Sequence, residues 1–481
     1  MKKFKIFTCV LLMFLLVSPL LPHGAYALPD PSPRARIVLL IDHNTGNTLF
    51  ALNENIRAYP ASLTKVMTVL LALEAIERGD ISLTDMVEAS PYIGFDLISA
   101  GATAGIQTGE ILSLEDLLYA AMLVSANEAT NIIAEHIAGT VPLFVRHMNE
   151  RAEELGMTGT NFANTHGLPN HYNFTTARDM AIMTKAAMTR PLFAEISSTV
   201  TWTIPATNMS EPRVLSNTNE LINRHSQPFP GYYFEGVTGV KTGFTSAAGL
   251  CLISTIDRGA MSLMCIVMGA DMVEWEGRMA RGNFTETIRM YEWAFANFSY
   301  HEILNTLSRV ASVPVLMGSD ANHVTLRPET SIMALLPNDQ GIDGFEKRIR
   351  IFSEEAGEPL VAPIAIGEVL GEVIMERDGV VYGSARLVAV TPVELSFALY
   401  IRTQVSRVLL NPIAILAIIG ILVLLAAYIR HLLIYYISRK KYYESLEKRR
   451  KVEEFNAAQS ATAAAVKPKR TPYDQNEENT S

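Results

Sequence analysis

The sequence of 481 residues has only three cysteines, and its ten histidines show no paired spacing. Histidine and cysteine pairs at short fixed intervals are the usual mark of a zinc site, so the sequence predicts no bound metal. The sequence has fewer basic than acidic residues, with 40 Lys and Arg against 49 Asp and Glu, and its formal net charge is -9. A basic face for nucleic acid is therefore not expected. Repeats of fixed period and tracts rich in Pro, or in Gly and Ser, are also missing.

The N-terminus has the composition of a secretory leader. Three lysines within the first five residues precede an apolar run over 6–17, and Ala25-Tyr26-Ala27 has the small-x-small form of a cleavage site. We therefore expect a signal peptide over 1–27 and a mature chain that begins at Leu28. An uncleaved anchor is the alternative, but the apolar run is short for a membrane span.

A second apolar stretch, over 408–429, contains no ionised side chain and is closed by Arg430. At about 1.5 Å rise per residue its length matches a bilayer core, so we predict a transmembrane helix. Basic residues follow at 439–441 and 448–451, and positive charge beside a span marks its cytoplasmic side. The prediction is a single-pass protein of the cell membrane, with a basic, partly disordered cytoplasmic tail over 430–481. The basic flank disfavours a buried core helix, and the lack of a polar face disfavours a helix on the membrane surface.

Between these ends the hydrophobic pattern changes once. In the first part, strand-like runs such as 37–42 alternate with apolar residues at helical spacing, as in 63–78 and 114–124. This pattern favours a sheet flanked by helices, an α/β or α+β domain over 28–300. Short alternating runs separated by Gly, Pro, Asn and Asp then predict a small all-β domain over 308–400.

Two cysteines, Cys251 and Cys265, flank a turn signal at Asp257-Arg258-Gly259 between two apolar runs. A hairpin centred near Arg258 would place the two thiols opposite each other. In an exported protein the pair could form a disulfide, and the alternative is two buried thiols on neighbouring strands.

Three short motifs carry side chains suited to nucleophilic catalysis. Ser62 and Lys65 stand three residues apart at the start of a predicted helix, so they share one face. A serine hydroxyl needs a base within hydrogen-bond reach, and a lysine can serve once burial or a nearby cation lowers its pKa. Ser125-Ala-Asn127 lies between two helices, where it could instead be a helix cap. Lys241-Thr242-Gly243 begins a strand-like run, and its glycine would let a substrate backbone approach closely.

Each motif alone is weak, but their order in one exported chain is specific. Ser-x-x-Lys, Ser-x-Asn and Lys-Thr-Gly form the signature set of penicillin-binding proteins and class A β-lactamases. Three further segments resemble the D-alanyl-D-alanine carboxypeptidases, the low-molecular-weight penicillin-binding proteins of peptidase family S11; they are Asn164–Leu168, Thr175–Met180 and Gly239–Gly249. The resemblance covers roughly Arg34 to Asn297 and implies the fold of serine β-lactamases and penicillin-binding transpeptidases for this domain.

The resemblance also implies a role for each matching residue. Ser62 would be the nucleophile that is acylated, and Lys65 and Ser125 would be the other catalytic residues, which take and relay its proton. The backbone N–H groups of Ser62 and Phe244 would form the oxyanion hole. The substrate would be held by Asn127, Lys241, Thr242, Gly243, Phe244 and Arg278.

The implied substrate is a peptidoglycan stem peptide that ends in D-Ala-D-Ala. Ser62 would attack the penultimate carbonyl, the terminal D-Ala would leave, and water would hydrolyse the acyl-enzyme. β-Lactams resemble this dipeptide and would inhibit by acylating the same serine, and no metal or organic cofactor is needed. Arg278 would assist in binding the substrate carboxylate, although Arg281 is near enough to compete for that role.

Two other functions fit part of this pattern. A β-lactamase would carry a Glu-x-x-Leu-Asn segment between Ser125 and Lys241, and the sequence has none there. A non-catalytic wall-binding scaffold would account for the β domain, but it would not need Ser62 and Lys65 together. We therefore expect a serine-type D-Ala-D-Ala carboxypeptidase; the sequence identifies none of its protein partners.

Overall fold

The structure, a computed structural model, describes residues 28–98, 101–225 and 231–464, apart from the side chains of 408–409 and 463–464. The expected signal peptide over 1–27 lies outside the described residues. The chain divides into two compact units. The first holds the residues up to Val313 with Thr325–Glu358 and Ile366–Thr391, and the second holds Pro314–Val324, Pro359–Ala365 and Pro392 onward.

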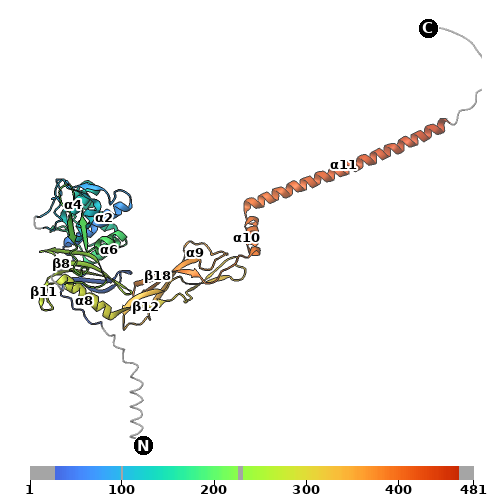
Figure 1. Cartoon of the computed structure of the whole chain (residues 1–481). Coiled ribbons are helices and arrows are strands. Elements are labelled where there is room, and N and C mark those ends of the chain that lie inside the picture. Colours follow the sequence, from blue (N-terminus) through green and yellow to red (C-terminus); the bar gives the residue numbers. More distant parts are fainter. Residues whose placement is uncertain (1–27, 99–100, 226–230, 465–481) are drawn as a thin grey trace, which may run out of the picture. The chain divides into compact units, whose positions relative to one another are not determined.

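A five-stranded antiparallel sheet forms the centre of the first unit, in the order β2-β1-β9-β8-β7 (Figure 1). Its strands are β1 (Ile37–Asp42), β2 (Thr48–Leu52), β7 (Val237–Thr245), β8 (Gly249–Arg258) and β9 (Met261–Ala270). Successive side chains of a strand point to opposite faces, so Ile37 and Leu39 enter one core while Val38 and Leu40 enter another. Burial on both faces is why β1 reads as a continuous apolar run.

Helices share these two cores with the sheet (Figure 1). The first core includes side chains of α2 (Lys65–Glu77), α3 (Leu114–Leu123), α4 (Asn127–Ala138), α5 (Val141–Glu154), α6 (Ala177–Met188) and α7 (Pro191–Ser198). The second holds Met290 and Tyr291 of α8 (Gly282–Asn297). The helices predicted over 63–78 and 114–124 are confirmed, except that the first turn before α2 is a separate 3-10 helix, η2 (Ala61–Thr64). The expected sheet flanked by helices is therefore present.

Three short two-stranded sheets extend this region. They are β3 (Met86–Glu88) with β4 (Ile111–Ser113), β5 (Thr201–Ile204) with β6 (Arg213–Ser216), and β10 (Met272–Trp275) with β11 (Arg278–Arg281). The last hairpin turns at Glu276 and Gly277, whose φ angles are 50° and 75°. Two left-handed residues in a row are what a tight two-residue hairpin turn requires.

The two cysteines lie on neighbouring strands but do not face each other. Cys265 pairs with Ser254 across the β8–β9 hairpin, so the expected opposition of Cys251 and Cys265 is wrong. Both thiols are free and buried, and burial raises the pKa of Cys251 to about 11 and that of Cys265 to about 12. They are core side chains with little thiolate character at neutral pH.

The part of the chain after α8 is built from strands. β12 (Phe298–Leu304) pairs with β15 (Ile332–Pro337). A second five-stranded sheet has the order β13-β14-β18-β17-β16, with β13 (Ala311–Pro314), β14 (His323–Pro328), β16 (Glu346–Ile351), β17 (Val369–Arg377) and β18 (Val380–Ala389). Only the four-residue helix α9 (Phe352–Glu355) interrupts the strands of 298–389, so the predicted all-β character is confirmed.

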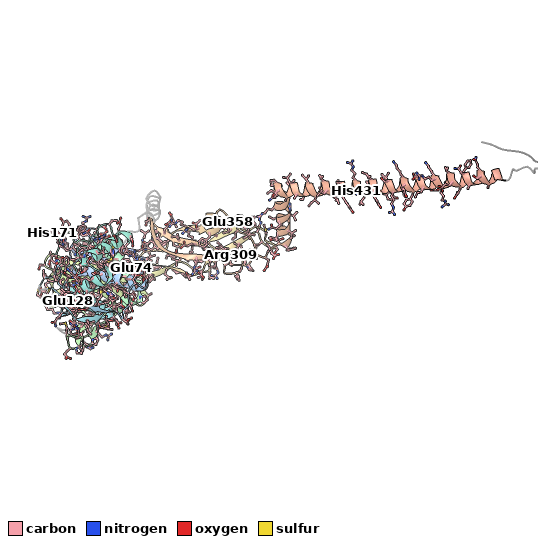
Figure 2. All side chains as sticks on the ribbon, turned by 90° about the horizontal axis from the view of Figure 1, so that it is seen from above. Glu74, Glu128, His171, Arg309, Glu358 and His431 are labelled. Atoms are coloured by element: carbon pink, nitrogen blue, oxygen red, sulfur yellow. The ribbon has the colours of Figure 1, made fainter. Side chains whose placement is uncertain are left out.

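Two helices end the described chain, α10 (Phe397–Leu409) and α11 (Pro412–Ala464). The Asn411 side chain accepts hydrogen bonds from the backbone N–H groups of Ile413 and Ala414, which caps α11 with proline in its first turn. The N-terminal part of α11 is long and apolar enough to cross a membrane. Its side chains, among them His431, project outward around the helix with no protein cover (Figure 2).

Candidate active site

One cavity of about 820 Å3 brings the three sequence motifs together. It borders the edge strand β7, the η2 turn that precedes α2 and the turn between α3 and α4. Its wall includes Ser62, Ser125, Thr242, Gly243, Phe244 and Arg281. The folded chain therefore gathers residues from distant parts of the sequence around a space large enough for a short peptide.

Ser62 lies where three backbone segments meet. It follows Ala61, whose positive φ of 48° is uncommon for a residue with a Cβ atom. A Cβ atom at Gly243 would lie 3.2 Å from the Ser62 nitrogen, and one at Gly167 would overlap the Ala61 carbonyl. Close packing from both sides therefore holds this strained turn, and strain that is maintained in this way is common at functional sites.

Lys65 is fully buried, and its Nζ atom has three hydrogen-bond partners. Nζ lies 3.1 Å from Ser62 Oγ, 2.7 Å from Asn127 Oδ1 and 2.8 Å from the His166 carbonyl oxygen. An ammonium donates to all three acceptors. A neutral amine keeps a lone pair, which can accept the proton of the Ser62 hydroxyl.

The electrostatic surroundings of Lys65 favour the neutral amine. Burial lowers its pKa well below the usual value, the positive charge of Lys241 lowers it further, and the carboxylate of Glu128 raises it again in part. Loss of hydration penalises a charged group, and a like charge nearby adds to the penalty. Burial and a nearby cation, the two conditions that let a lysine act as a base, therefore both apply to Lys65.

Ser125 and Asn127 enter the site from the turn before α4. Ser125 has a positive φ of 63°, and its buried Oγ has no hydrogen-bond partner among the residues that the structure describes. Asn127 begins α4, and its side-chain oxygen accepts a hydrogen bond from Lys65 Nζ. The N-cap of α4 is Ala126, without a side-chain bond, so neither residue serves as the helix cap that the sequence left open.

Lys241 and Thr242 lie on β7. Lys241 is buried, and its Nζ donates to the Thr242 carbonyl at 3.0 Å. Burial lowers its pKa to about 7, so it titrates near neutral pH. The Thr242 hydroxyl lies 2.7 Å from that of Thr218, which also lines the cavity. Phe244, two residues on along β7, is exposed at the cavity wall.

The two arginines of β11 differ in position. Arg281 lines the cavity, and its guanidinium pairs with Glu220 at 2.7 Å. Arg278 does not line this cavity, and its guanidinium lies over the ring of Tyr232, 5.7 Å from the centroid. Of these two arginines, Arg281 is the one that lines the cavity.

A buried carboxylate holds the part of the cavity wall that contains Gly101 and Ala102. Glu128 is 5% exposed and accepts hydrogen bonds from the Thr103 hydroxyl and the Ala104 N–H, both at 2.7 Å. It directly follows Asn127, so one helical turn positions both the Lys65 partner and this wall.

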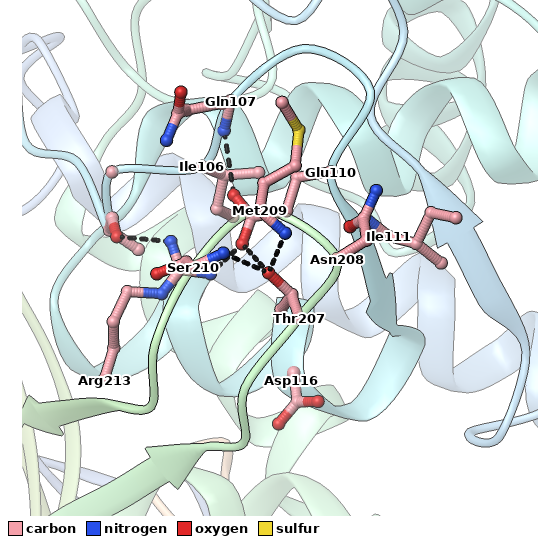
Figure 3. A network of polar contacts seen from close by, with 12 residues as sticks. Ile106, Gln107, Glu110, Ile111, Asp116, Thr207, Asn208, Met209, Ser210 and Arg213 are labelled. Carbon is pink, nitrogen blue, oxygen red and sulfur yellow. Dashed lines mark hydrogen bonds and ion pairs between the residues drawn. The ribbon is translucent and has the colours of Figure 1, made fainter.

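A second polar network also holds this segment (Figure 3). Arg213 donates to the Ala104 carbonyl at 3.1 Å and pairs with Glu110. Glu110 is fully buried and also accepts from the Thr207 hydroxyl at 2.7 Å. Because buried charges are costly unless they are paired, these contacts restrict the segment to one arrangement.

The sequence did not single out Glu128 or Thr218 as members of the site. The sequence offered one indication for Glu128, which is its position directly after the Ser-x-Asn motif. Thr218 had none, because it lies in a loop between β6 and β7 that only folding brings against Thr242.

His166 contributes its backbone rather than its ring. Burial and the nearby Lys65 lower its pKa to about 3, so the imidazole is neutral. Nδ1 accepts from the Leu168 N–H at 3.2 Å, which fixes the turn. Among residues 28–98, 101–225 and 231–464, no three His, Cys, Asp or Glu side chains are placed to hold a metal ion.

The sequence of the chain is similar to those of a known family of proteins. Residues 26–272 match the model of the peptidase family described as D-alanyl-D-alanine carboxypeptidase. The chain is 31% identical to D-alanyl-D-alanine carboxypeptidase DacA of Haemophilus influenzae, over 75% of this chain and 86% of that protein. It is 29% identical to D-alanyl-D-alanine carboxypeptidase DacF of Bacillus subtilis, over 74% of this chain and 85% of that protein.

Solved structures give the same result. Penicillin-binding protein 5 from Haemophilus influenzae superimposes with a TM-score of 0.58 at 30% identity, over 76% of this chain and all of that one. Penicillin-binding protein 3 from Streptococcus pneumoniae has a TM-score of 0.64 at 24% identity, over 75% of this chain and 99% of that one. The expected penicillin-binding fold, followed by a further sheet, is therefore confirmed.

Proposed function

The chain belongs to the D-alanyl-D-alanine carboxypeptidase family, and on that premise we propose that Ser62 removes the terminal D-Ala from peptidoglycan stem peptides. The observation that carries this proposal is the 3.1 Å contact between Ser62 Oγ and Lys65 Nζ. The pKa of Lys65 is well below its usual value, so its neutral amine can take the proton of the Ser62 hydroxyl. Activation by an adjacent base is what a serine nucleophile needs.

The proposed reaction has two halves. Ser62 Oγ attacks the penultimate carbonyl carbon while its proton passes to Lys65, and the backbone N–H groups of Ser62 and Phe244 stabilise the oxyanion. The C–N bond then breaks, Ser125 relays a proton to the departing amine, and D-Ala leaves. Water then attacks the resulting ester: its oxygen joins the acyl carbon, the bond to Ser62 Oγ breaks, and a proton of the water passes to Ser62 Oγ as the shortened peptide leaves.

The remaining residues bind and orient the substrate. Asn127 holds both Lys65 and the substrate amide, and Gly243 lets the peptide backbone lie against β7. The terminal carboxylate is bound by Thr242, with Lys241 and Arg281 as the nearby positive charges. β-Lactams acylate the same serine, since they mimic the D-Ala-D-Ala unit.

A membrane position completes the proposal. The apolar part of α11 crosses the bilayer once, and the basic residues after it lie in the cytoplasm. The catalytic region then lies outside the cell, where its substrate is.

The test uses fluorescent penicillin labelling and D-Ala release from a pentapeptide. We expect both for the wild type and neither for Ser62→Ala. Ser198→Ala, which removes an exposed serine hydroxyl, is the matched control and should keep both. Labelling that survives Ser62→Ala would contradict the proposed nucleophile, and rapid penicillin hydrolysis without D-Ala release would identify a β-lactamase instead.

A further inference from the structure

A second cavity, of about 290 Å3, lies in the first unit of the chain and shares no lining residue with the cavity around Ser62. The two cavities adjoin at the turn between β7 and β8. Ala247 and Ala248 of this turn line the second cavity, whereas Ser246 and Gly249 line the first. A volume of about 300 Å3 is near the lower end of the usual range for small-ligand sites. The second cavity therefore has room for a small ligand that takes no part in the reaction at Ser62.

The polar side chains that line this second cavity can all donate hydrogen bonds. They are Arg36, Arg57, Tyr59 and His171, and no Asp or Glu of the described chain lines the cavity with them. Within residues 28–98, 101–225 and 231–464, none of the four side chains forms a hydrogen bond or an ion pair, although acidic residues outnumber basic ones in the chain. Donors and positive charge without a protein partner make the cavity suited to an anionic ligand.

Packing holds the two arginines at the wall of the second cavity. The Arg57 guanidinium lies over the ring of Phe174, 4.4 Å from its centroid. The aliphatic stem of Arg36 lies against Gly269, where an added Cβ atom would be 3.2 Å from Arg36 Cβ and 3.5 Å from its Cδ. Side chains that are held in place before a ligand arrives lose less conformational freedom when it binds.

We propose that Arg36 and Arg57 form a binding site for a phosphate group, carried either by a small soluble molecule or by a lipid headgroup. Each planar guanidinium can bind two oxygens of one anion through parallel N–H groups. A phosphate group has enough oxygens to accept from both arginines and from the Tyr59 hydroxyl, whereas a carboxylate has only two. The proposal concerns binding alone, in which no covalent bond forms or breaks, and it does not depend on the carboxypeptidase reaction.

The size of the effect follows from the exposure of Arg36 and Arg57 to solvent. Ion pairs in contact with water contribute modestly, and two-pronged contacts of arginine with phosphate are stronger than most, so the loss of either arginine should weaken binding by roughly three- to tenfold. Salt screens such contacts, so the affinity should fall as the ionic strength rises from about 0.05 M to 0.5 M.

The experiment is isothermal titration calorimetry of the whole chain in an uncharged detergent. The four probes are inorganic phosphate, glycerol phosphate, phosphatidylglycerol added to the micelles, and acetate. We expect the wild type to bind phosphate probes more tightly than acetate. Arg36→Met and Arg57→Met keep an apolar stem and lose the charge, so each should weaken phosphate binding, and the double variant should abolish it.

Two further variants control for effects on folding and on overall charge. Arg57→Lys keeps the stem and the charge but loses the planar fork, so it should bind phosphate more tightly than Arg57→Met does. Arg309→Met removes an exposed guanidinium that does not line this cavity and should bind all four probes as the wild type does.

The probes also identify the source of the phosphate. Tighter binding of phosphatidylglycerol than of glycerol phosphate, with a loss in Arg36→Met, would support the site and identify a lipid headgroup as its ligand. The opposite order, with the same loss, would support the site and identify a soluble phosphate. The proposal is overturned if the wild type binds no phosphate probe, if the arginine variants bind as the wild type does, or if acetate binds as tightly as phosphate.

Discussion

A Cβ atom at Gly243 would lie 3.2 Å from the backbone nitrogen of Ser62. The edge strand β7 therefore packs closely against the turn that carries Ser62, and a side chain at position 243 would crowd that turn. This contact joins the Lys-Thr-Gly motif to the Ser-x-x-Lys motif at the wall of the cavity.

Gly243→Ala should slow acylation more than it destabilises the fold. The added methyl group would also lie 3.2 Å from Ala61 Cβ, so β7 and η2 must separate slightly. Overpacking of this kind costs about 1–3 kcal/mol, and a shift of a few tenths of an ångström misaligns the reacting atoms. We expect a loss on the order of tenfold or more in the rate of penicillin labelling, with a fall of a few degrees in Tm. Gly94→Ala is the control, because a Cβ atom there meets nothing within 4 Å; an equal loss in both variants would contradict the explanation.

The local part of this site could be predicted from the sequence. Ser62 and Lys65 are three residues apart, so their spacing predicts that the two side chains share a face, and they do so across the η2–α2 junction. The partners that complete the site depend on tertiary packing. Thr218 reaches Thr242 only through the path of a loop, and the choice between Arg278 and Arg281 depends on the twist of a hairpin whose side chains alternate.

Arg281→Ala should weaken substrate binding more than Arg278→Ala does. Arg281 lines the cavity, whereas Arg278 lies over Tyr232. Hydrogen bonds to charged groups contribute about 1.5–3 kcal/mol, so the loss of Arg281 should raise KM for a D-Ala-D-Ala peptide by roughly tenfold or more. Steady-state D-Ala release measures both variants. A larger effect of Arg278→Ala would restore Arg278 as the carboxylate ligand.

Glu128→Gln should shift the pH dependence of acylation. The Glu128 carboxylate raises the pKa of Lys65, against the lowering by burial and by Lys241; the neighbouring His166 ring stays neutral in this range. Gln can still accept from Thr103 and Ala104 but has no charge, so the pKa of Lys65 should fall further. Acylation needs the neutral amine, and the acidic limb of the penicillin-labelling rate should therefore move to lower pH.

The control for this shift is Glu153→Gln, which removes an exposed carboxylate on α5. Glu128→Ala removes the charge and also the hydrogen bonds to Thr103 and Ala104. We therefore expect it to lower the penicillin-labelling rate at all pH values, in addition to moving the acidic limb. An acidic limb that stays in place in Glu128→Gln, or moves to higher pH, would show that another group controls it. Lys241 is the first candidate, with its pKa of about 7.

The membrane topology can be tested with single cysteines. Glu358 and Glu447 are both exposed, the latter on the basic side of α11, and both native cysteines of the described chain are buried. An impermeant maleimide should label Glu358→Cys in intact cells. It should label Glu447→Cys only after the membrane is permeabilised. Labelling of Glu447→Cys in intact cells would reverse the proposed orientation.

Lys65 should make the stability of the protein depend on pH. Its pKa in the folded state lies well below the unfolded value of 10.5, so between these two values the unfolded chain binds more protons than the folded one. Stability from this group therefore rises with pH across that window, and it is lowest below the folded pKa. Lys65→Met has no such titration. The difference in Tm between wild type and Lys65→Met, measured on the whole chain in detergent from pH 6 to pH 10, should thus shift in favour of the wild type as the pH rises. A constant difference would mean that Lys65 keeps its proton in the folded state, and it could not then be the base that activates Ser62.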